Sequence, residues 1–221
     1  GVGPARYAPF AVGVGLAMLV GGRLAGLLYR PELLWRAPFE ALRTVGFVSW
    51  GGYAGLFAAA VLGARWLGLP APIVLDRLLL PALLCSAIGR FGCLSYGCCG
   101  GRPWAHGITW HHPDARIVRE LGREASVPRV PTQLLSSGLA LGLALILMLL
   151  TTRPLPPGAL TAFGVLVYGL GRASVESTRE EARYGRFCLT RGQLASLGLA
   201  ALGLVATLGL PDALGSWPVP A

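Results

Sequence analysis

The sequence predicts an all-α integral membrane protein, and the observations that predict it are composition and hydropathy. Of the 221 residues, 54% are hydrophobic and only 13% are charged, with a mean hydropathy of +0.61. A water-soluble domain carries roughly 25% charged residues, and a disordered chain combines low hydrophobicity with many charges. Both classes are therefore excluded, and we expect a single membrane domain over residues 1–221.

Apolar stretches long enough to cross a membrane recur along the chain. Windows of about 19 residues place spans at residues 9–29, 44–67, 78–97, 133–150, 158–175 and 193–210. Arg, Pro and Gly mark their ends, which is typical of helices that stop at the interface. Residues 30–43 are too short and polar for another span, so we expect six transmembrane helices, or at most seven. No cleavage site follows Arg6, which indicates a retained first helix rather than a signal peptide.

The positive charge of the chain is carried by arginine alone. All 19 basic residues are arginine, against 10 acidic residues, which gives a formal charge of +9. In so apolar a chain we expect anionic membrane lipids rather than nucleic acid as partners, because guanidinium groups match phosphate oxygens. The alternative is that the loop arginines only follow the positive-inside rule. The connections after the first, third and fifth spans hold 12 arginines and the opposite side holds four, which predicts that the former are cytoplasmic.

Two connections are long and polar, at residues 100–132 and 176–192. The first has roughly 33 residues, which are too few for an independent core. Its Trp104 and Trp110 suit a lipid interface. We expect this arginine-rich loop to cap the mouth of a lipid-binding cleft in the bundle.

Arg90 lies inside the third apolar stretch. A charged residue within a span costs roughly 2.5 to 3.5 kcal/mol on insertion scales, so Arg90 needs a partner or a bound anion. The alternative is a side chain that extends to the interface from the helix end. The first interpretation makes Arg90 a candidate site residue.

Polar side chains recur along one face of the fifth span. Tyr168, Arg172 and Glu176 follow one another at intervals of four, and Arg179 comes three residues later. At 3.6 residues per turn these side chains share a helical face. They form either an ion pair that only satisfies two charges or a polar cleft, and in the second case Arg172 and Arg90 bind one phosphate.

The chain has five cysteines, at positions 85, 93, 98, 99 and 188. Cys93, Cys98 and Cys99 can be redox active, bind a metal with His111 or His112, pack, or supply an active-site thiol. The spacing matches no known metal signature, so we expect no metal and no cofactor. Adjacent residues point about 100° apart on a helix, so we expect Cys98 and Cys99 not to face one cleft, and Cys99→Ser to lose little activity.

Four segments of the sequence resemble one known family, the prolipoprotein diacylglyceryl transferases. They are residues 89–103 (GRFGCLSYGCCGGRP), 131–134 (PTQL), 168–179 (YGLGRASVESTR) and 191–196 (RGQLAS). Their order and their positions relative to the spans also match, and the resemblance covers most of the chain from Ser49 onward. It implies a multi-pass enzyme of the bacterial inner membrane. Such an enzyme moves a diacylglyceryl group from phosphatidylglycerol to the lipobox cysteine of a prolipoprotein and releases glycerol phosphate.

Site residues follow from these motifs and from the charges in the spans. The predicted catalytic residues are Arg90, Arg172, Tyr168, Glu176 and Cys98. The predicted substrate-binding residues are Tyr7, Cys93, Gly101, Arg102, Gln133 and Arg179. Arg90 and Arg172 would hold the phosphate, and Glu176 would orient Arg172 rather than act as a base. A two-step reaction through the Cys98 thiol is the alternative to direct transfer.

The chain departs from the family pattern at three motif positions. Cys93 stands where the family has Asn, Cys98 where it has Glu, and Trp50 where it has His. These changes point to a cysteine-bearing branch. The family has seven spans and a signature loop on the periplasmic side, whereas the arginine count predicts the cytoplasmic side. Two other functions remain open, a membrane thiol oxidoreductase that uses Cys98 and Cys99 and a non-catalytic homologue that binds anionic lipid.

Overall fold

Long helices make up most of this protein in a computed structural model, which describes residues 4–28, 32, 46, 48–122, 126–179 and 189–214. Each of the six predicted spans coincides with one helix. The helices are α1 (Pro4–Leu28), α4 (Ser49–Leu67), α5 (Ala71–Tyr96), α7 (Thr132–Leu150), α8 (Ala159–Glu176) and α9 (Arg191–Leu214). A short helix, α6 (Arg116–Leu121), and a strand, β1 (Pro103–Ile108), lie between α5 and α7.

Within the described residues, four helices are long and apolar enough to cross a membrane. They are Ala8–Leu28, Ala71–Tyr96, Thr132–Leu150 and Gly192–Gly209. Arg172 and Glu176 lower the mean hydropathy of α8, which is not among them. The all-α membrane class is therefore confirmed, whereas the number of crossings stays a prediction.

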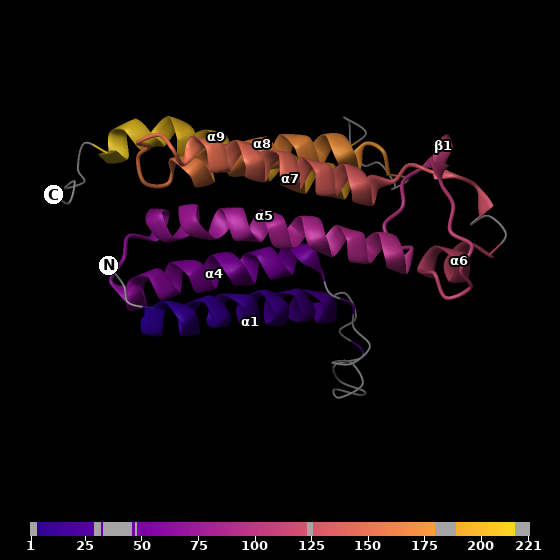
Figure 1. Cartoon of the computed structure of the whole chain (residues 1–221), viewed down its shortest axis with the longest axis horizontal. Helices are drawn as coiled ribbons and strands as arrows, with labels where there is room; N and C mark the ends of the chain where they lie inside the picture. Colours follow the sequence, from indigo (N-terminus) through magenta and orange to yellow (C-terminus); the bar gives the residue numbers. More distant parts are fainter. Residues whose placement is uncertain are drawn as a thin grey trace. The chain divides into compact units, whose positions relative to one another are not determined.

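The chain divides into two compact units, Gly1–Leu78 and Leu79–Ala221, and the division falls within α5. In the first unit α1 and α4 run along each other (Figure 1). Their backbones meet at glycines, because a Cβ on Gly51 would lie 2.5 Å from the carbonyl oxygen of Gly21. Small residues at such crossings allow the close van der Waals packing that holds helices together in lipid.

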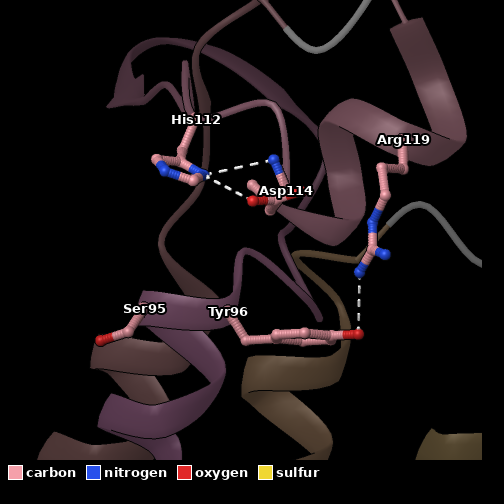
Figure 2. Close-up of a pocket in the computed structure, with 6 residues that line it drawn as sticks. Ser95, Tyr96, His112, Asp114 and Arg119 are labelled. Carbon is pink, nitrogen blue, oxygen red and sulfur yellow. Dashed lines mark hydrogen bonds and ion pairs between the residues drawn. The ribbon is translucent and has the colours of Figure 1, made fainter.

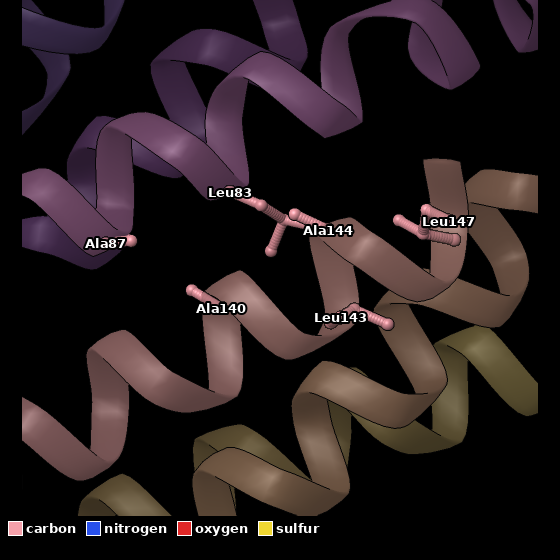
Figure 3. Packing of buried hydrophobic residues seen from close by; sticks show 6 residues of the cluster. All are labelled: Leu83, Ala87, Ala140, Leu143, Ala144 and Leu147. Carbon is pink, nitrogen blue, oxygen red and sulfur yellow. The ribbon is translucent and has the colours of Figure 1, made fainter. Parts of the chain in front are cut away.

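The second unit packs α7 against the later part of α5 and against α8. Its buried cluster consists of Leu83, Ala87, Ala140, Leu143, Ala144 and Leu147 (Figure 3). Leu83 of α5 lies against Ala144 of α7, and the Ser137 hydroxyl donates a 3.1 Å hydrogen bond to the carbonyl of Ala87. On the far side of α8, a Cβ on Gly169 would lie 2.6 Å from the amide nitrogen of Ala200 in α9.

Large apolar side chains cover the outside of these helices. Met148 and Leu149 of α7 are 60% and 63% exposed, and Leu202 and Leu208 of α9 are 67% and 69% exposed. The residues buried between the helices combine leucines with small residues such as Ala140, which is fully buried. This distribution suits a hydrocarbon environment, in which burial of large apolar groups provides little driving force.

The bounds of α5 differ from the predicted span 78–97 at the start. The helix begins at Ala71, directly after Pro70, whose carbonyl accepts hydrogen bonds from Ile73 and Val74. Proline is common at helix starts because its missing N–H needs no partner there. The hydropathy window missed this turn because Asp76 and Arg77 lower its average.

The end of α5 is a left-handed turn. Gly97 has φ of +66°, and the N–H of Cys98 donates to the carbonyl of Cys93 at 3.0 Å. Glycine reaches this conformation without a Cβ clash and commonly ends helices. Cys98 and Cys99 therefore lie beyond the helix, and the expected 100° separation does not apply to them.

The connection between α5 and α7 packs on the end of α5. The N–H of Ile117 donates to the carbonyl of Gly97 at 2.9 Å, and the Trp110 indole donates to the carbonyl of Leu94 at 2.9 Å. Part of the connection is strand β1, which the sequence did not predict. These bonds support a loop that caps this end of the helices rather than a separate domain.

Candidate active site

The C-terminal end of α8 holds one carboxylate between two guanidinium groups. Glu176 is 1% exposed and forms an ion pair with Arg172. Arg179 Nη1 lies 3.7 Å from the second carboxylate oxygen of Glu176. The predicted ion pair is therefore present. Glu176 therefore holds Arg172 and Arg179 together in one ion-paired cluster at this end of α8.

Gly192, at the start of α9, makes room for this cluster. A Cβ at Gly192 would lie 2.5 Å from Oε1 of Glu176 and 2.6 Å from its carboxyl carbon. Any larger residue would push the carboxylate away from its arginines. The resemblance motif at residues 191–196 contained this glycine, but the sequence offered no signal that it faces Glu176.

The sulfur atoms of Cys93, Cys98 and Cys99 all lie within 4.8 Å of one another. Cys93 is in the last turn of α5, and the turn at Gly97 brings the next two cysteines back to it. Cys99 itself has φ of +61°, the one positive φ at a non-glycine position among the described residues. The expectation that Cys99 faces away from Cys98 is therefore wrong, because the two residues lie on a turn and not on a helix.

The surroundings of the cluster shift the pKa values of Cys98 and Cys99 in opposite directions. Hydrogen bonds with Cys93 and Cys98 lower the pKa of the Cys99 thiol, and the charges of Arg179 and Arg90 lower it further. Hydrogen bonds with its two neighbours, together with burial, raise the pKa of Cys98. A covalent role for Cys98 stays a prediction, but Cys99 is the thiol that this environment favours as thiolate.

Arg90 is half-buried in α5, on the helix turn before Cys93. Within the described part of the chain its guanidinium forms no hydrogen bond or ion pair. Its charge acts on Cys99 together with that of Arg179, and Arg179 shares Glu176 with Arg172. Neither Arg90 nor Arg172 lines the pocket beside the cysteines, and the binding of one phosphate by both arginines stays a prediction.

Two side chains at the start of α7 bind the backbone of the turn after Gly97 that contains Cys98 and Cys99, which we call the cysteine turn. The Thr132 hydroxyl donates to the carbonyl of Cys99, and Gln133 Nε2 donates to the carbonyl of Cys98 at 2.5 Å. Gln133 is 1% exposed, and its Oε1 is buried without a hydrogen-bond partner in the described structure. The sequence identified Gln133 but missed Thr132, although both lie in the same motif.

Gly101 and Arg102, two predicted substrate-binding residues, follow the cysteine turn. A Cβ on Gly101 would lie 2.8 Å from side-chain atoms of Thr132 and Val130 and from the carbonyl oxygen of Thr178. Gly101 therefore has a packing role at this position. The backbone N–H of Arg102 donates to the carbonyl of Thr178 at 2.9 Å. The Arg102 side chain is exposed.

The remaining predicted residues lie in different parts of the chain. Tyr168 is half-buried, one turn before Arg172, and packs against the apolar cluster of α5 and α7. Tyr7 belongs to α1, in the other unit, and its side chain is outside the described structure. The side chain of Trp50 is also outside it.

A pocket of about 310 Å³ opens beside the cysteine turn. Its lining includes Cys98, Cys99, Arg116, Arg129 and Arg179. Glu120 also lines the pocket and forms an ion pair of 2.7 Å with Arg116. The other two arginines and the two thiols suit an anionic ligand that reacts with sulfur.

A second pocket, of about 420 Å³, lies between the end of α5 and the loop (Figure 2). Arg119 donates to the Tyr96 hydroxyl at 3.0 Å, and His112 lies 3.9 Å from the carboxylate of Asp114. His112 and Asp114 are 74% and 86% exposed. Neither His111 nor His112 joins the cysteine group among the described residues, so a metal site shared with a histidine has no support here.

Comparisons with known proteins cover nearly the whole chain. The model of the family described as prolipoprotein diacylglyceryl transferase matches residues 7–208. Three relatives are each named phosphatidylglycerol–prolipoprotein diacylglyceryl transferase. The one from Wolbachia pipientis subsp. Culex pipiens is 29% identical over 92% of this chain and 78% of its own length. The one from Wolbachia of Drosophila simulans is 31% identical over 88% and 74%, and the one from Bordetella avium is 32% identical over 86% and 72%.

Proposed function

Because the chain belongs to the prolipoprotein diacylglyceryl transferase family, we propose that it transfers a diacylglyceryl group from phosphatidylglycerol to the lipobox cysteine of a prolipoprotein. The transfer takes place at the bacterial inner membrane, in a multi-pass protein. The observation that carries the proposal is the ion-paired cluster of Arg172, Glu176 and Arg179, of which Arg179 lines the pocket together with Cys98 and Cys99.

The chemistry requires charge stabilisation above all. The acceptor sulfur attacks the glycerol carbon that carries the phosphate, a C–S bond forms, and the C–O bond to phosphate breaks. The electron pair of that bond leaves with glycerol phosphate, so negative charge grows on the phosphate oxygens. Fixed guanidinium groups aimed at this charge stabilise the transition state more than the ground state.

Arg172 and Arg90 take this role in our proposal. Glu176 orients Arg172 through their ion pair, because it is buried and also lies beside Arg179. Arg179 contributes to the same positive field, and Tyr168, one turn away, hydrogen-bonds a phosphate or ester oxygen. The exposed Arg102 side chain binds the lipid head group as it enters.

Gln133 supports the proposal through its unpaired oxygen. A buried acceptor without a partner is unfavourable, and a hydroxyl of the glycerol group can donate to it. Tyr7 and Cys93 remain substrate-binding candidates from the sequence. The unpaired Oε1 of Gln133 distinguishes it from Thr132, whose hydroxyl is already used.

The test is a transfer assay with purified protein in phosphatidylglycerol nanodiscs. The substrates are phosphatidylglycerol labelled in the glycerol backbone and a lipobox peptide with one cysteine. We expect a labelled thioether on the peptide and an equal amount of glycerol phosphate. A peptide with Ser in place of that cysteine is the matched control. Phosphatidylglycerol binding without any thioether would reject the transferase and favour the lipid-binding homologue.

A further inference from the structure

The three clustered thiols have a geometry that packing alone does not require. Cys93, Cys98 and Cys99 are free thiols. Around a zinc ion with Zn–S bonds of about 2.3 Å, tetrahedral sulfurs lie about 3.8 Å apart. The observed sulfurs, within 4.8 Å of one another, therefore reach such positions by small side-chain rotations.

The backbone holds this arrangement before any ligand arrives. Thr132 and Gln133 bind the carbonyl groups of both loop cysteines, and Gly97 fixes the turn through its positive φ. Metal sites depend on such preorganisation because each ligand must stay within a narrow range of position. Cysteines that only fill space need no such support.

The structure describes three ligands for this group. Among the described residues, no further Cys, His, Asp or Glu joins the three cysteines as a ligand. Structural zinc sites are closed by four protein ligands, whereas catalytic zinc sites have three and leave one position for water or substrate. Cys98 and Cys99 line the 310 Å³ pocket, so an open position has access to solvent and substrate.

The surrounding charge suits a thiolate complex. Three thiolates around Zn²⁺ carry a net negative charge, and a fourth thiolate increases it. Arg90 and Arg179 act on this cluster, and their guanidinium groups offset that charge. A site of neutral imidazole ligands would not benefit from the same surroundings.

We propose that Cys93, Cys98 and Cys99 bind one zinc-class ion as three thiolates, and that the open fourth position takes the acceptor cysteine of the peptide substrate. The second half rests on the proposed function. On coordination the acceptor thiol loses its proton to solvent, as a metal-bound thiol does. The resulting thiolate attacks the glycerol carbon, the C–O bond to phosphate breaks, and glycerol phosphate leaves with the electron pair. The ion changes neither its charge nor its redox state.

Metal content tests the first half. The protein is purified in detergent under reducing conditions, loaded with Zn²⁺ and freed of unbound metal. We expect about one zinc per chain in the wild type. The same is expected in the matched control Cys85→Ser, which removes an exposed cysteine of α5. Cys93→Ser, Cys98→Ser and Cys99→Ser should bind close to none.

Two further measurements keep the test valid if a variant does not fold. In the wild type, zinc should protect Cys93, Cys98 and Cys99, each followed by peptide mapping, from an alkylating reagent and leave Cys85 reactive. Loading with Co²⁺ should produce thiolate-to-cobalt charge-transfer absorption, which requires no turnover. Absence of both would overturn the metal site. Formation of a disulfide within the cluster under mild oxidant, without metal binding, would overturn it in favour of thiol redox chemistry.

The acceptor peptide tests acceptor binding at the metal separately from metal binding by the three cysteines. Adding the lipobox peptide to the cobalt form should shift the charge-transfer absorption, and the Ser-substituted peptide should not shift it. An unchanged spectrum would overturn acceptor binding at the metal. Full transfer by metal-free protein would overturn the metal role and leave the proposed function standing. A metal-bound protein that shifts with peptide but transfers nothing would instead reject the proposed function.

Discussion

Two regions of the second unit differ in their side chains: the middle, where α5 and α7 form the apolar cluster, is apolar, and the loop end, where the loop between α5 and α7 packs, is charged and polar. In the middle, leucine and alanine of α5 and α7 form an apolar cluster, beside which Ser137 donates to the carbonyl of Ala87 (Figure 3). At the loop end, α5 and α8 finish while α7 and α9 begin, and the contacts there are ion pairs and side-chain bonds to carbonyl groups. The difference teaches that the charges of the spans gather where the helix ends expose backbone groups.

The largest effect should come from removing the negative charge at the loop end. Glu176→Gln keeps the size of the side chain but removes the carboxylate charge that pairs with Arg172 and Arg179. We expect a loss of about 3–5 kcal/mol in the free energy of unfolding, as for other broken buried pairs. Denaturant titration in mixed micelles measures it.

Glu120→Gln is the matched control for this change. Glu120 also pairs with an arginine four residues away, Arg116, but both side chains are more than half exposed. An exposed pair contributes less than about 1 kcal/mol. Equal losses in the two variants would contradict the view that burial makes the Glu176 cluster different.

Arg172→Lys should reduce transfer without unfolding the protein. Lysine keeps the charge but cannot grip phosphate with two parallel donors while bonded to Glu176. Loss of one such contact in the transition state is worth about 2.7 to 4 kcal/mol, or about a hundredfold to a thousandfold in rate. The measurement is kcat with labelled phosphatidylglycerol. Arg153→Lys, at an exposed site between α7 and α8, is the control, and similar kcat values for both variants would argue against a phosphate clamp.

A cavity in the middle should affect stability and leave the chemistry intact. Leu143 is 2% exposed within the apolar cluster. Leu143→Ala should cost about 2 kcal/mol, the lower end for buried leucine, since lipid removes part of the transfer term but not the packing term. Leu145→Ala, at a site 60% exposed, should be nearly neutral. A loss of kcat in Leu143→Ala at temperatures where it is folded would show that the middle and the loop end are coupled.

The smallest effect should follow from loosening the loop. Trp110→Phe removes the indole donor that binds the carbonyl of Leu94. The loss should be about 0.5–1.5 kcal/mol, seen as faster hydrogen exchange in residues 100–131. The exposed Trp104 provides the control, Trp104→Phe, for which exchange should stay as in the wild type. Unchanged exchange in both variants would mean that other bonds hold the loop to α5.

Most of the fold was accessible from the sequence because its signal is local. Apolar windows located all six long helices but misplaced the starts of α1, α4 and α5, of which Pro70 explains that of α5. Hydropathy averages over neighbours, so the charged pair at 76 and 77 concealed the first turns of α5. Strand β1 was missed because it pairs only through isolated bridges with Arg129, which lies beyond the intervening α6.

The candidate site was accessible in part. Arg90, Arg172 and Glu176 were identified because a charged residue in an apolar helix is energetically costly and therefore indicates a function. That inference can be made before any partner is known. The cysteine cluster was misjudged because helical periodicity was applied beyond Gly97, where the backbone turns. The roles of Thr132 and Gly192 depend on contacts with residues more than ten positions away along the chain, which one sequence does not display.

The sequence by itself determined the membrane class, the six helices, the charged positions inside them and the family motifs. These follow from composition and from side-chain periodicity, which act over a few residues. Only the tertiary structure decided that Cys93, Cys98 and Cys99 converge, that Glu176 lies between two arginines, and that Gly192 leaves space for it. The physical reason is that these features arise where separate helix ends meet, and close packing there depends on distances that local propensities do not set.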